Sequence, residues 1–110
     1  ILIADAFVEH GPIPSDDLYE GADDINFDFM GEIAGSKMIL DGPCRNMMTH
    51  TGYGLCHAIK MASLTPAKLL GIDHRVGSIK AGKTANLIII DDMVHVKKVF
   101  LQGDLMVDNT

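Results

Sequence analysis

The chain has 110 residues, of which 47% are hydrophobic and 22% are charged, and its net charge is -6 at pH 7. This length suits one small domain, and the apolar content is sufficient for a buried core, so the composition excludes a disordered chain. The negative charge argues against nucleic acid or an anionic membrane surface as the main partner. No apolar run approaches the roughly 20 residues that a membrane span needs. No signal peptide is visible, so the cytoplasm is the default location.

The first predicted element is an apolar strand, residues 1–5, which ends on the carboxylate of Asp5. In barrel enzymes the strand tips face the pocket, which makes such an acid a candidate catalytic residue. The alternative is a turn residue that caps the next segment. The strand starts without an initiator Met, a cap or a turn. We therefore expect the chain to be the last part of a longer protein that carries only some of an active site.

Loops dominate the next thirty residues. Residues 10–15 hold two prolines and a glycine, which predict a loop. Residues 16–24 are acidic but lack the ligand spacing of a calcium loop, so we expect a solvated loop and edge strand. Residues 25–29 alternate apolar and polar side chains, which predicts a half-buried strand. Residues 31–36 are expected to form a glycine-bounded loop.

Three helices are predicted between residues 38 and 71. Apolar residues recur at helical intervals over residues 38–48 and again over residues 55–62. The third helix is shorter and has recognisable ends. Thr65 suits the N-cap, Pro66 the first helical position and Gly71 the C-terminal stop.

Residues 77–108 are predicted to form an all-β tail. Strongly β-branched runs at 85–90 and 94–101 predict two strands, and a turn at 102–104 leads into a third at 105–107. Residues 77–84 also match the Gly-x-x-x-x-Gly-Lys-Thr phosphate-loop pattern. A phosphate loop opens a helix, whereas these residues lead into a strand, so we expect the match to be accidental.

Cysteine and histidine give no metal motif. Cys44 and Cys56 have apolar neighbours and are expected to be buried free thiols. None of the histidines forms a ligand pair with metal-site spacing, so each is expected on the surface or in a loop. The histidines are His10, His50, His57, His74 and His95.

Several motifs resemble a known superfamily. Residues 58–71 and 77–91 are similar to a late helix pair and the following segment of the amidohydrolase superfamily. A narrower resemblance, to the N-acetylglucosamine-6-phosphate deacetylase family, lies upstream. It rests on Ala4-Asp5-Ala6, where that family commonly has Thr-Asp-Ala, and on Ala34-Gly35-Ser36, Arg45-Asn46-Met47-Met48 and Thr51-Gly52. The resemblance covers nearly the whole chain and is weakest over residues 7–32.

The resemblance implies an α/β fold. The chain would be the C-terminal fragment of a (β/α)8 amidohydrolase barrel together with part of a small β-sandwich domain. Residues 1–76 would hold the last barrel strand, a shortened hairpin excursion at 18–30 and the closing helices at 38–75. Residues 77–110 would supply the C-terminal strands of the sandwich.

The resemblance also implies a reaction and a site. The family removes the acetyl group from N-acetylglucosamine 6-phosphate, giving glucosamine 6-phosphate and acetate. Asp5 would be the catalytic residue that shuttles the proton, and Ile33, Ala34 and Gly35 would touch the sugar. A divalent metal, zinc or iron, would lower the pKa of the attacking water. Its ligands would lie mostly on earlier strands, with Asp5 as the one candidate within this chain.

The expected partner is a small-molecule amino-sugar phosphate. Binding to nucleic acid or to a membrane is not expected. The protein is expected to be a homo-oligomer. The isolated chain is expected to be inactive. One alternative is another amidohydrolase, of the dihydroorotase-like or adenine-deaminase-like kind. A second alternative is a non-catalytic oligomerising module, because an incomplete barrel would expose strand edges.

Overall fold

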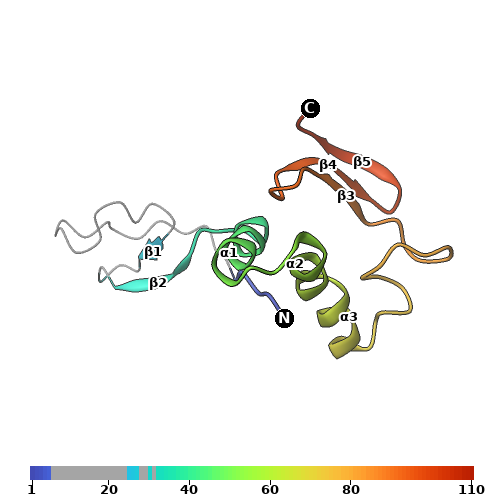
Figure 1. The fold of residues 1–110 in the computed structure, drawn as a ribbon. Coiled ribbons are helices and arrows are strands. Elements are labelled where there is room, and N and C mark those ends of the chain that lie inside the picture. Colours follow the sequence, from blue (N-terminus) through green and yellow to red (C-terminus); the bar gives the residue numbers. More distant parts are fainter. Residues whose placement is uncertain (6–24, 28–29, 31) are drawn as a thin grey trace. The chain divides into compact units, whose positions relative to one another are not determined.

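The computed structural model describes residues 1–5, 25–27, 30 and 32–110 (Figure 1). The chain forms two compact units, one of residues 1–3 and 40–110 and the other of residues 4–39. The helices of the larger unit are α1 (Asp41–Thr51), α2 (Leu55–Ala62) and α3 (Leu64–Leu70). Its strands are β3 (Leu87–Ile90), β4 (Val96–Leu101) and β5 (Asp104–Asp108). The smaller unit contains β1 (Ile25–Phe27) and β2 (Ile33–Ser36).

The first two helices overlap the predicted helical patterns. Helix α1 begins at Asp41, three residues later than the apolar pattern over residues 38–48, and runs three residues beyond it to Thr51. It is capped by Gly52, whose φ of 76° is left-handed. Pro43 fits this helix because it lies in the first turn, where a backbone N–H has no helical partner to lose. Helix α2 has the predicted bounds and buries Ala58. Among the described residues, no helix is both long and apolar enough to span a bilayer.

Helix α3 corrects one detail of the prediction. It begins at Leu64, so Ser63 occupies the N-cap position in place of Thr65. Pro66 is the third helical residue, which is still within the first turn and therefore costs no hydrogen bond. Gly71 ends the helix with a φ of 72°, as predicted.

The all-β tail is confirmed as a three-stranded antiparallel sheet in the order β3-β4-β5. Leu87 pairs with Phe100, and Leu101 pairs with Asp104 across the β4–β5 turn. Gln102 and Gly103 form this two-residue turn with φ values of 52° and 89°. Positive φ at both central residues matches the right-handed twist of a hairpin, which explains the glycine.

A small core joins the helices to the sheet within the larger unit. Its fully buried members are Cys44 from α1, Ala58 from α2 and Val94 from the β3–β4 turn. The partly buried residues around them are Leu2, Met48, Leu55, Ile59, Ala62 and Ile90. The predicted burial of the thiols is therefore right for Cys44 and wrong for Cys56, which is exposed on α2.

Two predictions near the N-terminus are wrong in secondary structure. Residues 1–5 have no regular structure, because a strand forms only beside a partner strand, and Leu2 instead donates a backbone hydrogen bond of 2.8 Å to the Met61 carbonyl. The loop predicted for residues 31–36 contains β2, which pairs antiparallel with β1. The strand predicted over residues 25–29 is confirmed at Ile25–Phe27. The loops predicted at 10–15 and 16–24 lie outside the described residues.

Candidate functional site

Asp5, the predicted catalytic residue, follows the short N-terminal segment and is exposed. Its φ of 44° is left-handed, which Asp tolerates better than most residues because its short side chain can bond locally. Among the described residues, no hydrogen bond or ion pair holds the carboxylate. Asp5 is thus an accessible acid in a turn-like conformation.

Ile33, Ala34 and Gly35, the predicted substrate contacts, lie on β2. Asn26 pairs with Gly35 and Phe27 with Ile33, so Ala34 is the extra residue of a β-bulge. Gly35 has a φ of 150°, which is unfavourable for residues with a side chain. Ile33 is 54% exposed. A bulge of this kind re-aims the neighbouring side chains and is over-represented beside active sites.

The described residues do not bring these two parts of the predicted site into a bonded cluster. Asp5 and residues 33–35 belong to the same compact unit, residues 4–39. No hydrogen bond joins them within the part of the chain that the structure describes. Nor do the described residues include a group of three or more His, Cys, Asp or Glu side chains that could hold a metal ion.

The histidines behave as predicted wherever they are described. His50, His57, His74 and His95 are all exposed, and His10 lies outside the described residues. His57 stacks on Tyr53, with ring centroids 5.5 Å apart and planes at 24°. His95 places its Nδ1 atom 2.8 Å from Oδ2 of Asp91.

The match to a phosphate loop is accidental, as expected. Strand β3 follows residues 77–84 where a phosphate loop would open a helix. Lys83 also has local partners, because its Nζ donates to the Asp73 carbonyl and, over 2.7 Å, to Oγ of Ser78. A Cβ atom built on Gly77 would lie 2.7 Å from Cβ of Ala67, so this glycine serves close packing on α3.

A polar cluster at the β3–β4 turn is the feature that sequence reasoning missed. Oδ1 of Asp91 accepts hydrogen bonds from the backbone N–H groups of Met93, at 3.0 Å, and His95, at 2.8 Å. The backbone bond from His95, then its ring and the Met93 N–H, lower the pKa of Asp91 to about 2. An acid that follows a β-branched strand is a typical start of such a turn, and that signal was present in the sequence.

Arg45 of α1 bonds to the same turn. Its Nη1 donates to the carbonyl oxygens of Val94, at 3.0 Å, and Met93, at 3.4 Å, while Nη2 pairs with Asp41 at 2.9 Å. Cys44 precedes Arg45 and lies in the core. Burial raises the pKa of its thiol, and the negative charge of Asp41 raises it further. These groups bind one another and leave no free acid–base pair, so the cluster is structural.

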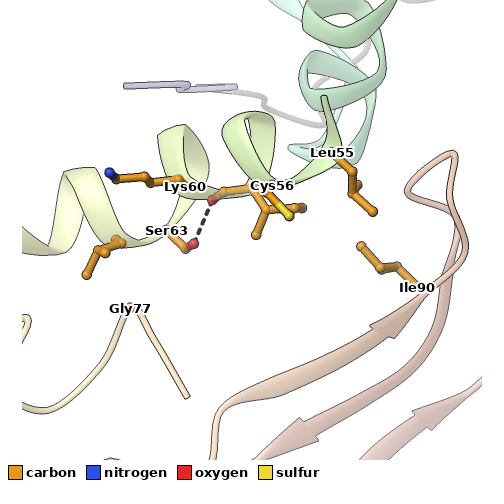
Figure 2. A pocket seen from close by; sticks show the side chains of 8 residues that line it. Leu55, Cys56, Lys60, Ser63, Gly77 and Ile90 are labelled. Carbon is orange, nitrogen blue, oxygen red and sulfur yellow. Dashed lines mark hydrogen bonds between the residues drawn. The ribbon is translucent and has the colours of Figure 1, made fainter. Parts of the chain in front are cut away.

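An apolar groove of about 400 Å³ runs between α2 and β3 (Figure 2). Leu55 and Ile90 point toward each other across it, and Ser63 bonds back to the Ile59 carbonyl over 2.6 Å. The lining residues are Leu55, Cys56, Ile59, Lys60, Ser63, Leu64, Gly77 and Ile90. The groove contains no carboxylate or imidazole, so it lacks the groups that amide hydrolysis requires.

Comparison with known proteins gives consistent matches. The N-acetylgalactosamine-6-phosphate deacetylase of Escherichia coli O157:H7 is 44% identical over 75 residues, which cover 68% of this chain and 20% of that protein. The N-acetylglucosamine-6-phosphate deacetylase of Bos taurus is 34% identical over 74 residues, which cover 67% of this chain and 18% of that protein. The crystal structure of N-acetylglucosamine-6-phosphate deacetylase from Pasteurella multocida superposes with a TM-score of 0.71 at 28% identity. The matched region covers 78% of this chain and 23% of the Pasteurella multocida chain.

The coverage of these relatives is partial. The chain spans about a fifth of the length of the two sequence relatives and 45% of a third, from Escherichia coli K12. The sequence pattern described as the amidohydrolase family matches residues 15–106, which is most of the chain. The chain belongs to the amidohydrolase family.

Proposed function

We propose that these residues are the C-terminal part of a metal-dependent hydrolase that removes the acetyl group from N-acetylglucosamine 6-phosphate. The products would be glucosamine 6-phosphate and acetate. The observation that carries the proposal is the similarity, over two thirds of the chain, to proteins named as deacetylases of amino-sugar 6-phosphates. The likeness to the Pasteurella multocida deacetylase structure supports it.

The proposal includes an architecture for the whole enzyme. Residues 1–76 would complete a (β/α)8 barrel with its last strand, a hairpin excursion and closing helices. Residues 77–110 would join a small β-sandwich domain. The antiparallel sheet β3-β4-β5 supports the second assignment, since each strand alternates its side chains between two faces. We further propose a cytoplasmic location and a homo-oligomeric assembly.

Asp5 is proposed as the proton shuttle. A water molecule attacks the amide carbon, and as the new C–O bond forms, Asp5 takes a proton from that water. The same proton then passes to the amide nitrogen as the C–N bond breaks, which releases the free amine and acetic acid. The acid gives up its remaining proton to solvent and becomes acetate. The exposure of Asp5 and the absence of a bonded partner among the described residues leave this carboxylate accessible for such a role.

Ile33, Ala34 and Gly35 are proposed to contact the sugar. Their bulged segment of β2 leaves Ile33 exposed, which gives an apolar surface for a sugar ring. The positive φ of Gly35 keeps this position free of a side chain, so that a ligand can approach the backbone closely.

The amidohydrolase family is generally metal-dependent. The described residues do not fit a metal site on their own, because no cluster of three ligand-type side chains occurs among them. Zinc or iron would therefore be held mainly by residues outside the described part, with Asp5 as the one proposed ligand within it.

A second candidate substrate is N-acetylgalactosamine 6-phosphate, which differs in the configuration of one ring hydroxyl. Two relatives named for that substrate are 44% identical to this chain, whereas relatives named for the glucosamine epimer are between 32% and 37% identical. The reaction and the proposed role of Asp5 are the same for both.

The test is an acetate-release assay on the longer protein that contains these residues, with each epimer in turn. Asp5→Asn keeps the shape of the side chain but cannot carry the proton, so kcat should fall roughly 100- to 10,000-fold with little change in KM. Dihydroorotate and adenine serve as competing substrates in separate assays, which follow ring opening to carbamoyl aspartate and release of ammonia, respectively. Turnover of either in place of the amino sugars, or a near-normal kcat for Asp5→Asn, would refute the respective part of the proposal.

A further inference from the structure

The sheet and the helices of the larger unit meet over a narrow region. Among the described elements, α1 packs on α2, α2 packs on α3, and each strand packs on its neighbour in the sheet. From the sheet, Ile90 at the end of β3 packs against the buried core. Val94, which lies in the turn between β3 and β4, is a fully buried member of that core. The turn of residues 91–95, together with the neighbouring Ile90, therefore attaches the sheet to the helices.

Val94 makes this attachment in an unfavourable backbone conformation. Its φ is 61°, although a β-branched residue strongly prefers negative φ. The side chain is only 2% exposed and lies in the cluster with Cys44 and Ala58. If Val94 leaves the core, it can return to the extended conformation that β-branched residues favour. Burial of the Val94 side chain thus favours the docked turn, whereas the backbone conformation of Val94 favours its release.

Two polar groups hold the turn in the docked conformation. Arg45 reaches across from α1 to the Val94 and Met93 carbonyl oxygens, at 3.0 and 3.4 Å. Asp91 organises the turn from within by accepting the N–H groups of Met93 and His95. The Arg45 bonds exist only while the sheet is docked, whereas the Asp91 bonds lie within the turn and can persist in both states.

The space beside the turn is open. A groove of about 400 Å³ lies between α2 and β3, and Ile90 lines it at the end of β3 (Figure 2). Release of Val94 would therefore also loosen the contact of Ile90 with the core.

We propose that residues 91–95 form a latch that opens and closes while the helices and the sheet remain folded. In the closed state Val94 fills the core and Arg45 holds its carbonyl oxygen. In the open state Val94 is withdrawn, the Arg45 bonds are broken, and the core surface of α1 that includes Cys44 is exposed to solvent.

The two cysteines of the chain allow a direct test. Cys44 is 2% exposed in the core beside Val94, whereas Cys56 is exposed on α2 and serves as an internal reference. The rate at which a thiol reagent labels each cysteine is measured on the full chain by mass spectrometry, at two protein concentrations. In the unmodified protein Cys56 should react rapidly and Cys44 slowly. Labelling of Cys44 should depend on urea much more weakly than global unfolding does.

Substitutions should change only the slow rate. Arg45→Met removes the bonds to the turn, so the reagent should label Cys44 about tenfold faster. The labelling rate of Cys56 and the far-ultraviolet circular dichroism should not change. Val94→Ala should accelerate Cys44 by a similar or larger factor, on the order of tenfold to a hundredfold.

Matched controls are available in the same unit. Arg75→Met removes the other arginine, which is exposed, and Val107→Ala shortens an exposed valine of β5. Neither should alter the Cys44 rate. The latch is refuted if Cys44 of the unmodified protein reacts only through global unfolding, with the same urea dependence, or if Arg45→Met and Arg75→Met behave alike. The first of these readouts requires no variant, so misfolding of Val94→Ala cannot hide the answer.

Discussion

The Asp91 carboxylate is bonded to two backbone N–H groups and to the His95 ring, and the Lys97 ammonium lies 3.9 Å away. The bond from the His95 backbone N–H, then those from the His95 ring and the Met93 N–H, favour the ionised form and lower the pKa of Asp91 to about 2. Because the folded pKa lies below the unfolded value of about 4, the contribution to stability is complete above pH 4. It is lost as the pH falls from about 4 to about 2.

We predict that Asp91→Asn lowers the midpoint of thermal unfolding at pH 7 and flattens its decline between pH 4 and pH 2. The amide can replace only part of the bonding of the carboxylate and carries no charge. Calorimetry at a series of pH values measures both effects. Asp92→Asn is the matched control, because Asp92 is exposed in the same turn and should leave the pH profile unchanged. Identical profiles for the two variants would contradict the assignment.

Val94 shows why the attachment of the sheet is finely balanced. Full burial of a valine contributes about 1.5–3 kcal/mol. A non-glycine residue in a sparsely populated backbone region costs about 1–3 kcal/mol. The two values nearly cancel, so the bonds from Arg45 decide whether the turn stays docked.

The residues of this turn were only partly predictable. Asp91 follows a β-branched strand, which is a typical signal for a turn. The left-handed conformation of Val94 was not predictable, because a β-branched residue is among the least suited to it. The bonds from Arg45 join residues 48 and 49 positions apart in sequence, so they depend on tertiary packing that local patterns do not contain. For Asp5 and residues 33–35, the proposed roles come from resemblance, and the structure supplies only their backbone setting.

At the scale of elements, Gly77 links the loop after α3 to that helix. A Cβ atom at this position would meet Cβ of Ala67 at 2.7 Å and backbone atoms of Ser63 and Leu64 at 3.3 Å. Gly82 has a similar φ, 91° against 96° for Gly77, but a Cβ atom there would have nothing within 4 Å. Substitutions at Gly77 and Gly82 therefore share the cost of backbone strain and differ in the cost of crowding.

We predict that Gly77→Ala destabilises the chain more than Gly82→Ala does. Both variants place a side chain at positive φ, at a cost of about 1–2 kcal/mol. Only Gly77→Ala also overpacks the contact with α3, which adds about 1–3 kcal/mol. Urea unfolding curves give the difference between the two free energies of unfolding. Equal destabilisation would show that the loop moves away from α3 without cost.

The elements of the tail were predicted better than those near the N-terminus, for a physical reason. The strands of the tail find partners close in sequence, and the turn at Gln102 and Gly103 fixes the register of β4 and β5. Residues 1–5 have the composition of a buried strand, but no strand pairs with them among the described residues. Strand β2 was missed because Gly31 and Gly35 indicate a loop, whereas the structure uses Gly35 next to a bulge.

At the scale of the whole molecule, we predict that the 110-residue chain alone has no deacetylase activity. Asp5 is the one candidate catalytic group proposed among the described residues, and those residues contain no cluster that could hold a metal. An acetate-release assay with added zinc should give the background rate. Turnover that is lost on Asp5→Ala would contradict this prediction, since it would show that the chain completes its own site.

The surface of the chain favours self-association. Every residue of β5 is exposed, including Leu105, Met106 and Val107, and Ile88 and Ile89 of β3 are also exposed. Strands β3 and β5 are the outer strands of their sheet, and neither has a further neighbour among the described residues. An open edge with apolar side chains is a template for pairing with another chain.

We therefore predict a dimer or larger species in light scattering at micromolar concentration. A lysine on an edge strand opposes pairing because its charge must remain in water, so Met106→Lys should shift the mass toward the monomer. Ala81→Lys adds the same charge at an exposed turn outside the sheet and should leave the mass unchanged, which separates edge blocking from a general charge effect. If the unmodified chain gives a sharp monomer mass and a cooperative melt, its exposed strands do not need a partner. The proposed completion of a larger barrel and sandwich would then lose its main physical support.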